Sequence, residues 1–230
     1  MKQLKKVMAM GLATMAAVSA MSMNAIAEEN VSTDEQSACI KANSESDLKA
    51  DEVVGVYLSA NGTVQTVTVG DVTSGNDTFT LVNGAQVTFS IGDTMNAGYS
   101  TFSTMRSNEF TSTQRPSYNV TPYSIDNSEY DGYADLSAGS TLYSNRLLSN
   151  GSSSDVMITA IPEGENLTNT TYTLYYYASS SRYNQLAQLS GGTTERSMNI
   201  SNMPSNTRMF LKLTNSNSSD RTPFVSVAGY

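Results

Sequence analysis

Two Asn-Gly pairs, each lying between runs of β-branched residues, set the tightest constraint on what this chain can fold into. The pairs are Asn61-Gly62 and Asn83-Gly84, and both residues of such a pair adopt positive φ at little cost, which suits the turn of a β-hairpin. In the second hairpin apolar and polar residues also alternate, which is typical of a strand with one buried face. We therefore predict a small four-stranded antiparallel meander over residues 51–97. Its strands are expected at residues 53–59, 63–69, 79–82 and 85–91.

The rest of the chain, residues 98–230, consists of short strand-like runs separated by turn residues, with no stretch of helical periodicity. Many short strands at a spacing of roughly 8 to 12 residues indicate a β-sandwich. The predicted fold class is therefore all-β, an antiparallel β-sandwich or jelly-roll-like domain preceded by the meander. The sequence leaves open whether the two are one domain or two. Candidate strands cover residues 99–105, 117–123, 130–136, 141–148, 155–161, 171–178, 183–189, 196–200, 207–214 and 223–228.

The order of the closing strands resembles that of known secreted modules. A Tyr-rich strand, a polar turn, a Met-Asn-Ile strand, a Pro turn and a Phe-Leu-Lys-Leu strand follow one another between Thr171 and Val227. In outline this order is similar to the closing strands of pre-peptidase C-terminal domains and of various carbohydrate-binding modules. The resemblance implies a sandwich fold and, because it rests on strand order alone, it implies no functional residue.

The first 27 residues have the pattern of a secretory signal, because three lysines precede an uncharged run that is followed by an Ala-x-Ala site ending at Ala27. This pattern predicts bacterial export with cleavage before Glu28, and a transmembrane anchor is the alternative. The acidic residues 28–50 are then expected to form a flexible leader. We expect a secreted or extracellular protein, held at the cell surface by non-covalent contacts at most, with no membrane contact after signal removal. The role of Cys39 stays open between a free thiol and an intermolecular disulfide.

The composition excludes several kinds of chemistry. The chain has no His and one Cys, so His-based catalysis, His metal ligands and an intramolecular disulfide are excluded. With 13 basic and 21 acidic residues the formal net charge is −8, which argues against a nucleic-acid partner because phosphate binding needs a basic face. The acidic excess lies mainly in residues 28–97. Arg residues farther along the chain then either contact the acidic meander within one molecule or form a scattered, solvated surface.

A Tyr-rich strand near residue 175 is the most unusual apolar feature. Strand alternation places Tyr172 and Tyr176 on one face and Tyr175 and Tyr177 on the other. One set is expected in the core, and the other forms an exposed aromatic row suited to stacking on sugar rings or to a protein partner. The candidate ligand-binding residues are Tyr175, Tyr177 and Tyr183, which begins the next predicted strand. The alternative is a purely structural role, because Tyr is common in strands.

An acidic cluster around residue 130 is a candidate calcium site. Hard cations take several oxygen ligands, and a loop that alternates Asn, Glu and Asp before a Gly can supply them. The predicted ligands are Asn127, Glu129, Asp131 and Asp135. The corresponding EF-hand pattern is incomplete, because Ala138 stands where a Glu is required. The alternative to a calcium site is a solvated loop between two strands.

Together these observations predict a secreted, non-catalytic extracellular or cell-surface β-sandwich module that binds a polysaccharide or a cell-surface protein. One alternative is a glycan-active enzyme with paired carboxylates, the general acid–base chemistry that remains to a His-free chain of this kind. Another is a self-associating surface or matrix component, because edge strands can pair between molecules. No catalytic residue is assigned. The carboxylate candidates for the enzyme alternative are Glu129, Asp131, Asp135, Asp155, Glu163 and Glu165.

Overall fold

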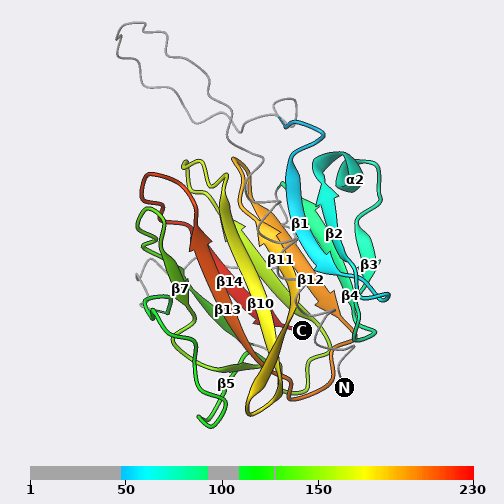
Figure 1. The fold of residues 1–230 in the computed structure, drawn as a ribbon, viewed down its shortest axis with the longest axis vertical. Coiled ribbons are helices and arrows are strands. Elements are labelled where there is room, and N and C mark those ends of the chain that lie inside the picture. The colour runs from blue at the N-terminus through cyan, green and yellow to red at the C-terminus, as the bar shows by residue number, and fades with distance from the viewer. Residues whose placement is uncertain (1–47, 93–108, 127) are drawn as a thin grey trace, which may run out of the picture. The chain divides into compact units, whose positions relative to one another are not determined.

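The computed structural model describes residues 48–92, 109–126 and 128–230, which belong to one compact unit, Asn43–Tyr230. These residues form an all-β sandwich of an eight-stranded and a six-stranded sheet (Figure 1). All strand pairs are antiparallel except that of β5 with β8, so the predicted fold class is confirmed. The predicted signal, most of the predicted leader, Cys39 and the candidate strand at 99–105 lie outside the described residues. Within the described ranges, no helix has the length and apolar character needed to cross a bilayer.

The eight-stranded sheet has the strand order β2-β1-β11-β10-β13-β8-β5, with β7 also paired to β13. Its longest strands, β10, β11 and β13, lie side by side at the centre and support the candidate site. The bounds are β1 (Val53–Leu58), β2 (Val64–Thr68), β5 (Tyr123–Ser124), β7 (Thr141–Tyr143), β8 (Leu148–Ser149), β10 (Thr170–Ser179), β11 (Arg182–Ser190) and β13 (Arg208–Asn215).

The six-stranded sheet has the order β3-β4-β12-β9-β14-β6, so β6 is an edge strand. A short helix, α2 (Val69–Thr73), follows β2, and the Thr68 and Asp71 side chains form a capping box at its start. The strand bounds are β3 (Thr78–Thr80), β4 (Gln86–Ile91), β6 (Glu129–Tyr133), β9 (Val156–Ile161), β12 (Arg196–Ser201) and β14 (Phe224–Gly229).

Both predicted hairpins form, but with a different turn. Gly62 and Gly84 have positive φ (78° and 86°), whereas Asn61 and Asn83 do not. In the first turn the amide of Gly62 donates to the Ser59 carbonyl oxygen, and Asn61 Oδ1 accepts from the Thr63 amide (3.2 Å). Asn therefore stabilises the turn through its side chain, and only the Gly supplies the left-handed conformation.

The two hairpins do not form one four-stranded sheet. Strand β1 pairs with β11, which adds the first hairpin to the eight-stranded sheet, and β4 pairs with β12, which adds the second hairpin to the six-stranded sheet (Figure 1). Their inward side chains, among them Val54, Val67 and Phe89, belong to the same core cluster as Leu174 and Leu211. Strands β1 to β4 thus contribute one hairpin to each layer, and this division buries an apolar face of both hairpins in the core.

Arg196 joins the two sheets in the core. It lies on β12, is 0% exposed, and forms a salt bridge with Glu52. It also donates to the carbonyl oxygens of Val53 (2.7 Å) and Ser190 (3.2 Å), the first residue of β1 and the last residue of β11 in the opposite sheet. Burial lowers the pKa of Arg196, and the Glu52 carboxylate opposes that shift. A Cβ on Gly192 would lie 2.5 Å from the guanidinium, so a larger residue at this position would displace the Arg196 side chain. Through Glu52, the acidic N-terminal part of the chain contacts an Arg of the sandwich, which was one of the two predicted arrangements.

Candidate functional site

The outward face of the central strands carries a cluster of aromatic side chains. On β10 the alternation is as predicted, because Tyr172 and Leu174 are fully buried in the core while Tyr175 and Tyr177 point to the other side. On β13, Met209, Leu211 and Leu213 lie in the core, and Phe210 belongs to the outer cluster with Tyr177. We call this cluster the aromatic face. It comprises Tyr118, Tyr143, Tyr175, Tyr177, Tyr183 and Phe210.

A β-bulge in β11 brings Tyr183 onto this face. Leu174 pairs with Ala187 but Tyr175 pairs with Gln185, so Leu186 is an extra residue without a partner in this register. A shift by one residue moves all following side chains to the other face of the sheet. Tyr183 is consequently the direct cross-strand partner of Tyr177.

Phe210 is the centre of the aromatic face. Tyr175 stacks on it with ring centroids 5.0 Å apart and planes 9° apart, and Tyr177 and Tyr183 lie with their centroids 5.4 Å from its own. Phe210 is 1% exposed, so its side chain is the centre of a second, smaller hydrophobic core and cannot contact a ligand directly. Its burial fixes the positions of the surrounding Tyr rings.

The segment at 111–118 packs over one side of the aromatic face. A strand was predicted to begin at residue 117, but the segment is mostly irregular and a turn begins at Tyr118. Tyr118 packs edge-on against Tyr177, with ring centroids 5.4 Å apart. Tyr177 Oη donates to the Pro116 carbonyl oxygen (2.5 Å) and accepts from Arg115 Nη1 (3.2 Å). Tyr177 is therefore only 7% exposed, whereas Tyr183 is 42% exposed. The expected open row of Tyr175 and Tyr177 is thus largely covered, and Tyr183 offers the accessible ring.

Two Arg side chains lie over Tyr rings at the margin of the aromatic face. The guanidinium of Arg115 lies 4.5 Å from the centroid of Tyr183, and that of Arg208 lies 4.6 Å from the centroid of Tyr118. Arg208 Nη1 also donates to the Tyr118 carbonyl oxygen. These cation–π contacts hold both guanidinium groups beside the rings instead of leaving them free in solvent.

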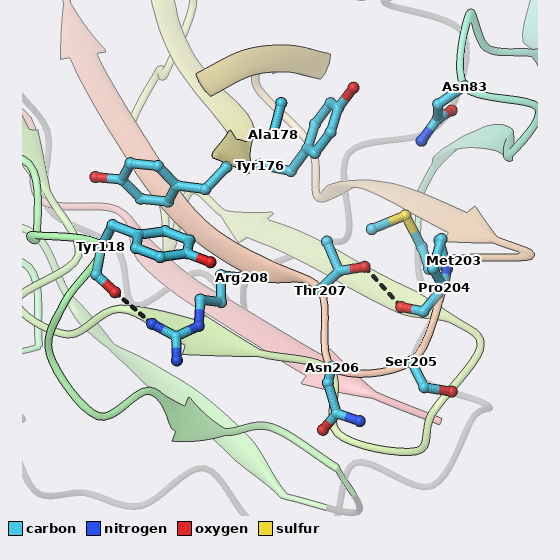
Figure 2. A pocket seen from close by; sticks show the side chains of 11 residues that line it. Asn83, Tyr118, Tyr176, Ala178, Met203, Pro204, Ser205, Asn206, Thr207 and Arg208 are labelled. Atoms are coloured by element: carbon cyan, nitrogen blue, oxygen red, sulfur yellow. Dashed lines mark hydrogen bonds between the residues drawn. The ribbon is translucent and has the colours of Figure 1, made fainter. Parts of the chain in front are cut away.

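Two hollows adjoin the Tyr118–Tyr177 pair, which lines both of them. The first, about 480 Å³, is called here the Tyr176 hollow, and Figure 2 shows Tyr118 and Tyr176 opposite the turn at residues 203–207. The second, about 500 Å³, is called the Tyr183 hollow and is lined by Arg115 and Tyr143 as well. Both have the volume of small-molecule sites. Their polar lining includes Asn83, Ser205, Asn206, Thr207 and Arg208 in the first hollow and Thr113, Gln114, Arg115, Ser117 and Ser180 in the second.

The predicted calcium ligands lie elsewhere, on or beside β6 of the other sheet. Glu129 and Asp131 are in the strand, with their side chains on its outward face, and Asp135 is exposed beyond its end. The segment is thus a strand and not the loop that the EF-hand pattern requires, because Tyr130 between the two acids is buried in the core. Asn127 lies outside the described residues. In the described part of the chain, no three acidic or Cys residues are grouped as metal ligands, and calcium binding stays a prediction.

The pKa values of the acidic pair on β6, Glu129 and Asp131, are both raised. Burial raises the pKa of Glu129, and the negative charge of Asp131 adds to this rise. Burial also raises the pKa of Asp131, and the negative charge of Glu109 adds to this rise. Two other carboxylate candidates have hydrogen-bond donors of their own. Glu163 accepts from Tyr133 Oη (2.7 Å), and Glu165 accepts from the Thr222 amide (3.0 Å). None of these acids lines either hollow.

Comparison with known proteins adds no family to this geometry. No family model, curated protein or solved structure matches the chain. The functional interpretation therefore rests on the residues themselves.

Several residues of the site were not identified from the sequence. Arg115 lies in an irregular segment, and Tyr118 and Asn206 lie in turns, so strand alternation does not determine which way these side chains point. The alternation of residue types along β13 is consistent with Arg208 and Phe210 sharing a face, but their position beside Tyr175 depends on the pairing of β13 with β10. The available signal is composition, because nearly all Tyr residues and all Arg residues follow residue 93.

Proposed function

We propose that this protein is a secreted, non-catalytic module that binds polysaccharide on the aromatic face of its eight-stranded sheet. The observation that carries the proposal is the pair of adjoining hollows, lined by Tyr rings and by amide, hydroxyl and guanidinium groups. A sugar ring offers apolar C–H faces, which pack on aromatic rings, and hydroxyl groups, which exchange hydrogen bonds with amides and guanidinium groups. A chain of such rings fits two neighbouring hollows better than one compact small molecule does.

The support of the site favours binding by a preformed surface. Tyr175, Tyr177 and Tyr183 lie on long central strands, and the Phe210 ring fixes them from the side of the sheet. Side chains locked by packing lose little entropy when a ligand binds. The predicted signal agrees with an extracellular polysaccharide as the ligand.

The proposal of a non-catalytic role rests on where the carboxylates lie. Glycosidases use two acidic side chains on either side of the scissile bond. Among the described residues that line the two hollows there is no Asp or Glu. The acidic pair Glu129 and Asp131 lies on the other sheet, away from the Tyr rings.

Retention on polysaccharides tests the proposal. The purified chain of residues 28–230 is incubated with insoluble peptidoglycan, cellulose, chitin and mucin, and in affinity gels with soluble polysaccharides. Binding without release of sugar is expected, and Tyr183→Ala and Tyr118→Ala should each weaken it, whereas Tyr133→Ala on β6 is the matched control. Sugar release that Glu129→Gln abolishes would establish the enzyme alternative. Concentration-dependent light scattering without retention would favour self-association.

A further inference from the structure

We infer that the polysaccharide bound at the two hollows is anionic, with carboxylate or sulfate groups along its chain. This inference rests on the proposed function and adds to it the chemical class of the ligand. It follows from the distribution of charge, which on the eight-stranded sheet is opposite in sign to that of the whole protein.

The strands of the eight-stranded sheet carry basic side chains and no acidic ones. Their charged residues are Arg182, Arg208 and Lys212, although the chain holds 21 acidic and 13 basic residues in all. In the six-stranded sheet the exposed or half-buried strand charges are Glu129 and Asp131, and Arg196 is buried. An acidic protein that keeps one face basic attracts anions to that face and repels them elsewhere.

Each hollow holds one guanidinium group that no carboxylate neutralises within the described residues. Arg115 lines the Tyr183 hollow, and Arg208 lines the Tyr176 hollow. Buried Arg196, by contrast, is paired with Glu52. Arg115 is exposed and uses Nη1 for Tyr177, which leaves the rest of its fork of donors for a ligand.

The position of both guanidinium groups suits a repeating charged sugar. Each lies against a Tyr ring, so an anionic group that meets the guanidinium brings the adjoining sugar ring to the aromatic side chain. Arg binds carboxylate and sulfate-like groups through two parallel hydrogen bonds, which also fixes their orientation. Neutral sugars would offer hydroxyl groups to both guanidinium groups but would leave the two positive charges without an anionic partner.

Single-stranded nucleic acid is the other anionic polymer that stacks on aromatic rings. The observations favour polysaccharide, because the formal net charge of −8 opposes a densely charged phosphate backbone outside the one basic face. An oligonucleotide therefore belongs in the experiment as a competing ligand.

The decisive experiment compares polymers that share a backbone and differ in charge. Affinity electrophoresis measures binding to polygalacturonate and its methyl ester, and to chondroitin sulfate and its desulfated form, at low and high salt. At least one charged polymer should bind about tenfold more tightly than its neutral or less charged counterpart, as expected for charge-assisted hydrogen bonds. High salt should reduce this preference.

The variants locate the effect. Arg115→Gln and Arg208→Gln should each weaken binding of the charged polymer about tenfold. Arg146→Gln is the matched control, because Arg146 also lies over a Tyr ring, Tyr123, but lines neither hollow. Thermal melting checks each fold, and should Arg208→Gln unfold, exposed Arg115 decides the result.

Three results would overturn the inference. Equal binding of both members of each polymer pair would remove the charge requirement and leave the proposed function standing. Tighter binding of oligo-dT than of any polysaccharide would assign the face to nucleic acid. Retention on no polysaccharide, charged or neutral, would remove the proposed function together with the inference.

Discussion

The eight-stranded sheet and β6 pack against the same hydrophobic core, but their outward faces differ in chemistry. Tyr172 of β10 and Tyr130 of β6 both point into that core. The outward side of β10 belongs to the aromatic face, with its Tyr rings, and the two hollows beside it contain Arg115 and Arg208. The outward side of β6 carries Glu129 and Asp131. The difference teaches that net charge, which is negative for the chain, does not describe the surface that a ligand meets.

The Arg side chains show the same contrast on the scale of single residues. Arg196 is enclosed, paired with Glu52 and bonded to backbone oxygens of the other sheet, so its role is structural. Arg115 and Arg208 lie at the margin of the aromatic face and contact rings. The three positions can therefore be separated experimentally, since the proposal expects Arg196 to act on stability and Arg115 and Arg208 to act on binding.

The largest expected effect is on stability, when the link that Arg196 forms between the two sheets is removed. Arg196→Ala leaves Glu52 and two carbonyl oxygens without their donor and should lower the free energy of unfolding by about 3 to 5 kcal/mol. For a chain of this size, the melting temperature then falls by roughly 10 °C. Exposed Arg182→Ala is the control. A melting temperature of Arg196→Ala equal to that of the control would show that the link contributes nothing.

An intermediate effect is expected on binding, and it sharpens the comparison of the two faces. Tyr183→Ala removes the accessible ring and should weaken polysaccharide binding by about tenfold, or about 1.4 kcal/mol. The melting temperature should change little, because Tyr183 is 42% exposed. Tyr133→Ala, on the face of β6, should leave affinity unchanged. Equal losses for both variants would mean that the aromatic face has no special role.

The smallest effect concerns the acidic pair on β6. Because the folded-state pKa of Glu129 and of Asp131 is raised, protonation favours the folded state. This stabilisation is present at pH values below their ordinary pKa and is lost as the pH rises through the raised values. Glu129→Gln with Asp131→Asn should therefore raise the melting temperature at pH 7 by about one or two degrees, since solvent screens both groups, and by less at pH 4. A lower melting temperature of the double variant at pH 7 would contradict the assigned shifts.

Local patterns predicted much of this fold. The glycines after Asn61 and Asn83 marked both hairpins, and strand alternation placed Tyr172 and Tyr175 on opposite faces of β10. The distribution of the hairpins over two sheets was not predictable, because it depends on pairings with β11 and β12, more than a hundred residues away.

The site was less predictable for the same reason. Tyr175 and Tyr183 were identified, but the bulge at Leu186, which places Tyr183 outward, has no signature in the local sequence. The cover of Tyr177 by Arg115 and Pro116 results from a contact between segments about sixty residues apart. The sequence places nearly all Tyr residues and all Arg residues after residue 93, and only the tertiary structure brings the two residue types together.

The most direct test of the central proposal, that the aromatic face binds the ligand, is a chemical-shift map of the isotopically labelled protein. Oligomers of polygalacturonate or of chondroitin sulfate, whichever polymer the affinity gels show to bind, are titrated while the backbone amide signals are followed. The proposal predicts changes centred on Arg115, Tyr118, Tyr183 and Asn206, with none on β6. Changes confined to Glu129, Asp131 and their neighbours, or no changes at all, would contradict it.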